Sequence, residues 1–394
     1  MLQKGKKFCY TVEKRKNDVH HMKKISLLEA LEGITDTRRE KSVIYPLHEV
    51  LFMMLTAVIC GATSYVKIEM FAKSKEAWLK KYLALENGIP DACTFRNIIK
   101  AIDTKQFHGV FVEWMRSVVE NATGVVAIDG KQARRTKDAT KKPLHVVSAF
   151  SSECQLVLGQ LACEEKSNEI TAIPKLLEML EIKGCIVTID AMGTQTEIAK
   201  KITEKEADYI LALKSNQASM YEDVRLYFED YCKEAGIKET ERYSKTHESA
   251  HGRTETRECY ISEDINWMVN KEKWSNLNGI GVIISKVQQG ENTAVQRHYF
   301  LYSCKNMTAA QLMAAKRSHW RIENSLHWVL DMQFREDESR ARKDNSAENL
   351  NVLRHMAYNT LKNETSLKGS FSDKQFRCLL DEAYLNKIVK LWVS

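Results

Sequence analysis

Two short apolar runs in this chain each end in an aspartate, and they constrain its fold more than any other feature. They are "GVVAIDG" at 124–130 and "CIVTID" at 185–190. Both are short and rich in β-branched residues, so they predict buried strands. Asp129 and Asp190 stand where these strands end. In an open α/β sheet, side chains at the carboxyl ends of strands point into the ligand crevice.

The segments around these runs complete an alternating pattern. Strand-like runs also lie at 145–150, 154–163 and 208–214, and helical spacing is found at 168–180 and 194–207. The predicted order is therefore β-β-β-α-β-α-β. Apolar strands separated by helices are typical of an α/β sheet with both faces covered.

The N-terminal part has a different character. Residues 1–24 are polar and Lys-rich and predict a basic arm, whereas 25–120 carry helical periodicity without a strand pattern and predict an all-α domain. The longest apolar run, at 50–62, is shorter than the ~20 residues that a membrane-spanning helix needs. We therefore expect a buried helix there and no membrane partner.

In the second half of the chain, the alternation of strands and helices is interrupted and then a helical pattern resumes. Residues 220–305 predict a β-rich insertion, which includes a hairpin joined by the turn "QQGEN". A long helix is expected from about 309, because Thr308 and Gln311 fit a capping box. Residues 366–394 predict a C-terminal helical tail.

Composition narrows the class of protein. With 44% hydrophobic and 28% charged residues, the chain has the composition of a soluble protein with a large core. Ten cysteines are scattered without a Cys-x-x-Cys pair, which disfavours a zinc ribbon and favours reduced thiols in a cytoplasm. The formal charge of +7 permits a polyanionic partner without requiring one.

The stretch "HWRIENSLHWVLD" at 319–331 places His319, Glu323 and His327 at i, i+4 and i+8. At about 100° per residue, Glu323 and Trp320 fall on the apolar side of this helix. A core-facing carboxylate needs a compensating cation, so Glu323 is a candidate metal ligand. Two alternatives are a zinc trio of the three residues and a glutamate at the edge of the stripe, paired with His319 or an arginine.

Together, Asp129, Asp190 and Glu323 supply the hard oxygen ligands that Mg²⁺ or Mn²⁺ prefers. Two such ions can activate an attacking hydroxyl and stabilise the leaving oxygen at a phosphodiester. The alternative for each aspartate is a turn residue or a helix cap.

The chain resembles bacterial insertion-sequence transposases of the DDE type, in the H-repeat-associated or ISAs-type branch. The resemblance covers about 25–365. It rests on "VVAIDGKQAR", "VTIDAMGTQ", "DYILALKSNQ", "HGRTETRE" and "HWRIENSLHWVLDMQFREDESR", and in the N-terminal part on "DTRREKSVIYPLHEVL", "CGATSY" and "GIPDACTFRNI". It implies an RNase H-like DDE catalytic domain at 124–365, with the insertion between the second Asp and the Glu. It also implies that 25–120 form a transposase-associated, DNA-binding domain.

The resemblance further implies that Asp129, Asp190 and Glu323 are the catalytic triad and hold two Mg²⁺ or Mn²⁺ ions. The expected activity is cleavage at the element ends and joining of the 3′-OH to target DNA. The expected partners are the terminal inverted repeats and target DNA, bound by a dimer or higher assembly in a bacterial cytoplasm, at the nucleoid. The alternative is a degenerate insertion-sequence protein that binds DNA without recombining it.

Basic and aromatic residues around the acids are candidate DNA contacts. The stretch at 130–142 carries six basic residues directly after Asp129, a charge that suits phosphate binding but also a solvated turn. For Trp320 core packing is favoured, and His319 and His327 are interpreted as positioning residues rather than metal ligands. The DNA-binding candidates are Lys131, Arg134, Arg135, Lys214, Arg253, His319, Arg321 and Trp328.

Overall fold

The computed structural model describes residues 26–39, 41, 43–119, 122–137, 142–164, 168–234, 236–250 and 252–393, with the backbone alone for 391–393. The basic arm predicted at 1–24 lies outside these residues. The chain divides into two compact units. We call Asn121–Lys343 the sheet unit, and Met1–Glu120 together with Asp344–Ser394 the helical unit.

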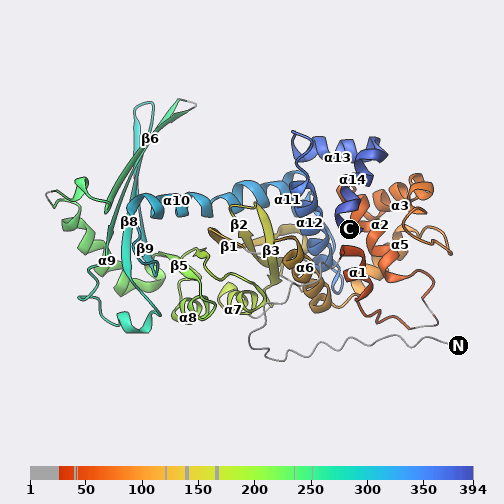
Figure 1. Ribbon diagram of the computed structural model, residues 1–394, viewed down its shortest axis with the longest axis horizontal. Helices are drawn as coiled ribbons and strands as arrows, with labels where there is room; N and C mark the ends of the chain where they lie inside the picture. The colour runs from red at the N-terminus through yellow and green to blue at the C-terminus, as the bar shows by residue number, and fades with distance from the viewer. Residues whose placement is uncertain are drawn as a thin grey trace. The chain divides into compact units, whose positions relative to one another are not determined.

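One mixed sheet of nine strands forms the core of the sheet unit (Figure 1). Its spatial order is β3-β2-β1-β4-β5-β9-β8-β7-β6. The strands are β1 (Val125–Ala133), β2 (Leu144–Ser151), β3 (Leu156–Ala162), β4 (Ile186–Ile189), β5 (Asp208–Leu213), β6 (Tyr243–Ala250), β7 (Arg253–Ser262), β8 (Gly279–Gln289) and β9 (Asn292–Tyr302).

The first five strands confirm the predicted order of elements. Helix α7 (Glu169–Met179) follows β3, and α8 (Thr196–Glu204) follows β4. Strands β1, β4 and β5 are parallel neighbours, whereas β1–β2 and β2–β3 are antiparallel. The two crossover helices let β1, β4 and β5 run in one direction, so their carboxyl ends meet at the same edge of the sheet.

The predicted β-rich insertion is confirmed, and it extends the same sheet. After α9 (Ala218–Tyr231), strands β6 to β9 form an antiparallel series. Strand β9 pairs antiparallel with β5, with Ile210 opposite Tyr302. The predicted hairpin is β8–β9, and its turn holds Gly290 at a φ of +59°. Only glycine adopts that conformation without steric cost.

The helix predicted from about 309 begins as expected and then changes its winding. The Thr308–Gln311 capping box starts α10 (Ala309–His319). A π-helical segment follows at Ile322–His327, and α11 (Trp328–Met332) completes the stretch. Leu312 and Met313 of α10 pack in a buried cluster with strand residues, so α10 covers one face of the sheet.

The helical unit confirms the all-α region predicted at the N-terminal end. Its helices are α1 (Leu27–Glu32), α2 (Leu47–Ile59), α3 (Tyr65–Ser74), α4 (Glu76–Leu79), α5 (Ala92–Ala101), α6 (Thr104–Val118), α12 (Ser346–Asn363), α13 (Phe371–Leu380) and α14 (Glu382–Val393). Helix α2 is buried on nearly all sides, and α12 packs against α2, α5 and α6 (Figure 1). The boundary expected at 365 therefore differs from the end of the sheet unit at Lys343. In the described part of the chain, no helix is long and apolar enough to cross a membrane.

Candidate active site

Asp129 and Asp190 come from neighbouring parallel strands. Strands β1 and β4 pair with Ile128 opposite Ile189. Asp190 is the residue that directly follows β4, as expected. Asp129 was also expected at a strand end, but it lies within β1, which continues to Ala133 because it pairs with β2 beyond the end of β4. The two acids therefore lie on neighbouring strands at the level where β4 ends. Asp190 Oδ1 accepts hydrogen bonds from two backbone N–H groups of the following turn, at 3.1 and 3.4 Å. Asp190 thus organises the turn that follows β4.

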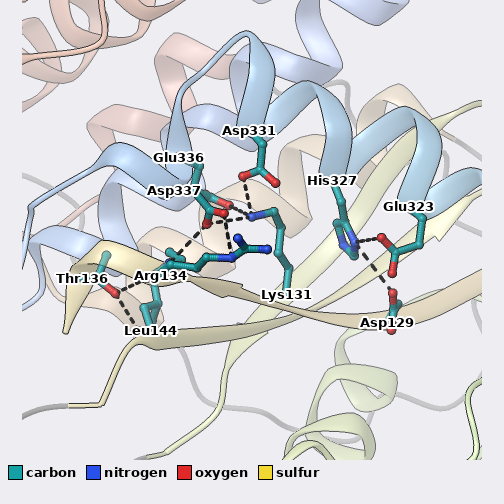
Figure 2. Close-up of polar contacts among 11 residues, drawn as sticks. Asp129, Lys131, Arg134, Thr136, Leu144, Glu323, His327, Asp331, Glu336 and Asp337 are labelled. Carbon is teal, nitrogen blue, oxygen red and sulfur yellow. Dashed lines mark hydrogen bonds and ion pairs between the residues drawn. The ribbon is translucent and has the colours of Figure 1, made fainter.

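The π-helical segment brings Glu323 and His327 to Asp129. His327 Nδ1 lies 3.2 Å from Glu323 Oε2 and 3.7 Å from Asp129 Oδ2 (Figure 2). Among the described residues, these three form a group whose possible ligand atoms all lie within 4.8 Å of one another. The side chain of His327 is 7% exposed, that of Asp129 15% and that of Glu323 47%. The group therefore has a buried floor and one side open to a ligand.

The two acids of this group perturb each other. Burial, and then the neighbouring Glu323 carboxylate, raise the pKa of Asp129 to about 8. Hydrogen bonding from His327 outweighs burial and, with the contribution of Asp129, lowers the pKa of Glu323 to about 2. The cause is that two carboxylates this close repel when both are charged. A cation would relieve the same repulsion.

The sequence-based orientation of the helix was wrong in one respect. Glu323 and Trp320 were expected on the core-facing side, but the Trp320 side chain is 53% exposed and Glu323 lies at the open edge. The i→i+5 bonding of a π-helix widens the turn at Ile322–His327, so α-helical periodicity misplaces Glu323. Trp320 precedes this segment and is the C-cap of α10. Glu323 is paired there with His327 rather than with His319. The buried positions of the stretch include Leu312, Ala315, Ile322 and Leu326.

His319 lies beside the second aspartate. Its Nδ1 is 3.0 Å from Thr188 Oγ1 on β4. Burial lowers the pKa of His319, against the opposing effect of Asp190 and Glu323. His319 is thus held against strand β4 and close to both acids, which fits a positioning role.

Lys131 forms a second cluster, two residues beyond Asp129 on the same face of β1. Its Nζ lies 2.7 Å from Asp331, 3.4 Å from Glu336 and 3.4 Å from Asp337 (Figure 2). We call these four residues the Lys131 cluster. Burial alone would lower the pKa of Lys131, but the three carboxylates raise it above its ordinary value. The cluster joins β1 to α11, through Asp331, and to the segment that follows α11.

The Lys131 cluster was not foreseen from the sequence. Lys131 was expected to contact DNA, yet its side chain is 12% exposed and surrounded by acids. Its surroundings therefore favour a structural role over phosphate binding. One signal was available: Asp331 continues the i, i+4 series of Glu323 and His327, and the acid run "REDES" follows directly.

The other DNA-binding candidates differ in their availability. Arg253 is half exposed and pairs with Glu255 of the same strand. Arg134 is 81% exposed although it pairs with Asp337. The candidates that lie exposed in the sheet unit are Arg134, Arg135, Lys214, Arg321 and Trp328.

The donor set fits a hard divalent cation. Carboxylate oxygens from Asp129 and Glu323 converge, and Asp190 lies at the next strand end. Of the two carboxylate oxygens of Asp190, only Oδ1 accepts a hydrogen bond from the described residues. Mg²⁺ and Mn²⁺ are bound by such carboxylates. The zinc trio of His319, Glu323 and His327 is not favoured, because His319 Nδ1 is directed to Thr188.

Two family descriptions match the chain. The one described as "Transposase DDE domain" matches residues 120–360, and the one described as "DDE_Tnp_1-associated" matches 28–115. The first covers the whole sheet and every acid of the site.

Individual relatives agree with these matches. The chain is 38% identical to "Putative transposase YncI" of Escherichia coli O157:H7, over 92% of this chain and 94% of that protein. It is 36% identical to "H repeat-associated putative transposase YhhI" of Escherichia coli K12, over 92% and 97%. A shorter match, 33% identical over 18% of this chain and 87% of the relative, is "Inactive transposase YbfQ" of the same strain.

Proposed function

Because the chain belongs to the DDE transposase family, with its RNase H-like fold, we propose that it cuts phosphodiester bonds at insertion-sequence ends and joins the freed 3′-OH to target DNA. The observation that carries this proposal is that Asp129 lies close to Glu323, although Glu323 comes 194 positions later in the sequence. The two acids lie beside the end of β4, which Asp190 follows. We assign these three acids as the catalytic triad.

Two divalent ions, Mg²⁺ or Mn²⁺, complete the site in this proposal. Asp129, Asp190 and Glu323 would hold these ions. When bound, such ions activate the attacking oxygen and stabilise the leaving oxygen of an in-line displacement. The acids contribute fixed negative charge at a rigid strand edge, so the reacting groups need little reorganisation.

Exposed basic residues around the acids supply the phosphate contacts. Arg134 and Arg135 follow β1, Lys214 follows β5, and Arg321 precedes Glu323 on the helix. Arg321 also donates a hydrogen bond to the backbone oxygen of Ser152 at 3.0 Å, which orients its guanidinium. Contacts to phosphate fix the register of the duplex rather than its sequence.

Trp328 supplies a stacking surface for an unpaired base at the element end. Its side chain is 54% exposed although it follows a buried histidine. A base drawn out of its duplex is stabilised by stacking on an aromatic face.

Strand nicking at a cognate end tests the assignment. The DNA flanking the gene identifies that end, because inverted repeats bracket an insertion sequence. Asp129→Ala, Asp190→Ala and Glu323→Ala are each expected to abolish Mg²⁺-dependent nicking while fluorescence anisotropy shows retained DNA binding. Asp230→Ala, which removes a 92% exposed carboxylate on α9, is the matched control. Full nicking by any triad variant contradicts the assignment.

A degenerate DNA-binding protein is the alternative function. It predicts that the wild-type protein binds the cognate end but leaves it intact with either Mg²⁺ or Mn²⁺. The presence of all three acids favours the active enzyme. Light scattering with and without end DNA separately tests the expectation that a dimer or higher assembly forms on DNA.

A further inference from the structure

The imidazole of His327 occupies an unusual place for a residue that only packs. It lies between the two acids that meet across the site, with Nδ1 facing both. The residue is 6% exposed, and within the described part of the chain its Nε2 has no hydrogen-bond partner. Every polar contact of the ring therefore runs through the nitrogen that faces the acids.

The spacing of the donor atoms matches the coordination sphere of a small ion. Metal–ligand bonds of about 2.1 Å place neighbouring ligands about 3.0 Å apart in an octahedron and about 3.4 Å apart in a tetrahedron. His327 Nδ1 lies 3.2 Å from Glu323 Oε2 and 3.7 Å from Asp129 Oδ2. These two separations are close to those values, and all three possible ligand atoms lie within 4.8 Å of one another, so the group can close around one ion.

We propose that His327 Nδ1 is a direct ligand of the ion held by Asp129 and Glu323, so that this ion is bound by two carboxylates and one neutral imidazole whose proton is on Nε2. The inference rests on the proposed function and deepens it, because it states which ion the site prefers. Imidazole nitrogen binds first-row transition ions better than it binds Mg²⁺. The centre therefore prefers Mn²⁺ to Mg²⁺.

The π-helical winding supports this assignment. It carries both Glu323 and His327, and the neighbouring Ile322 and Leu326 are fully buried. Such segments often occur at functional sites. The packing holds the imidazole in place before any ion binds, so little side-chain entropy is lost on coordination.

Electron paramagnetic resonance of bound Mn²⁺ tests the ligand directly and without reference to activity. In the wild-type protein, electron spin-echo modulation is expected to show coupling to nitrogen-14. The coupling should change to that of nitrogen-15 when the histidines are labelled. His327→Asn places an amide near the position of Nδ1, and it is expected to abolish the coupling. His319→Asn is the matched control on the same helix and should retain it.

Competition between Mn²⁺ and Mg²⁺ for the protein measures the preference of the site for Mn²⁺. His327→Asn is expected to weaken Mn²⁺ binding at least about tenfold, because loss of even an outer-shell partner of a metal ligand costs that much. Mg²⁺ binding should weaken less, so that the Mn²⁺/Mg²⁺ selectivity falls. Thermal unfolding without metal checks that the variant is folded, and His327→Gln provides a second variant if it is not.

The outcomes separate this inference from the proposed function. Mn²⁺ that binds in an Asp129-dependent manner without nitrogen coupling overturns the ligand role of His327 and leaves the carboxylate site intact. Nitrogen coupling that persists in His327→Asn also overturns the ligand role of His327, because the coupled nitrogen then belongs to another residue. Mn²⁺ binding that is absent, or unaffected by Asp129→Asn, overturns the metal site itself.

Discussion

Replacing Lys131 by methionine tests whether the Lys131 cluster holds the site together. The substitution keeps most of the side-chain volume but removes the charge that faces Asp331, Glu336 and Asp337. Glu336 is 1% exposed, so its carboxylate is left without this cation in a place that water does not reach. Unfavourable burial of charge and repulsion among the three acids should both lower the free energy of unfolding.

The magnitude follows from the exposure of the partners. Breaking a fully buried ion pair costs about 3–5 kcal/mol. The side chains of Asp331 and Asp337 are 34% and 23% exposed and are partly screened by water. We therefore expect Lys131→Met to lower the free energy of unfolding by about 2–3 kcal/mol. Adding Glu336→Gln removes the buried charge, so the double variant should recover about 1–2 kcal/mol.

Urea unfolding followed by circular dichroism measures this cycle, with the transitions of the two units fitted separately. Lys175→Met is the matched control. It breaks a pair with Glu164 of the same 2.7 Å length, in which both side chains are more than half exposed. That variant should lose less than about 0.5 kcal/mol. The reasoning is refuted if Lys131→Met lowers the free energy of unfolding by a similarly small amount. It is also refuted if the losses of Lys131→Met and Glu336→Gln simply add in the double variant.

Three further outcomes are expected. Burial would raise the pKa of Glu364, but hydrogen bonds, including one from the Tyr384 hydroxyl, lower it to about 2. A carboxyl whose pKa is lowered on folding stabilises the protein above its ordinary pKa and loses that effect as the pH falls. Glu364→Gln should therefore lower the free energy of unfolding, measured with urea, by up to about 3 kcal/mol at pH 7 and by far less near pH 2. Mn²⁺ or Mg²⁺ should raise the melting temperature of the wild-type protein, because an ion that binds the folded state stabilises it, and Asp129→Asn should abolish the increase in a thermal-shift assay. Trp328→Ala should weaken binding of an end that carries an unpaired base about tenfold in anisotropy titrations, with little change in stability. An equal loss of affinity for fully paired DNA would contradict the stacking role. Trp320→Ala is the exposed control on the same helical stretch.

The features that the sequence predicts correctly depend on local patterns. The runs that end in Asp129 and Asp190 are recognisable because a buried strand needs only a few consecutive β-branched residues. Their adjacency follows from the parallel pairing of β1 with β4, which places the residues after Ile128 and Ile189 side by side, although β1 continues beyond Asp129. The capping box at Thr308 is equally local, since it needs only two side chains three positions apart.

The features that it misses depend on partners far along the chain or on a change of helical period. The exposure of Glu323 depends on the π-helical winding, which the projection at about 100° per residue cannot reveal. The burial of Lys131 depends on acids 200 and more positions away, and charge alone made it resemble a phosphate-binding residue. Whether β9 would join β5 was likewise undetermined, because an edge strand accepts any partner of suitable length.

The helical unit is assembled from both ends of the chain, and this sets the order in which the protein can fold during its synthesis. Helices α1–α6 leave the ribosome first, but α2 lacks the buried surface of α12 until almost the entire chain has been made. The sheet unit is continuous in sequence and is complete before α12 emerges. The helices made first are thus the last to gain their full core, and a chain that stops before α12 has a finished sheet and an exposed apolar α2.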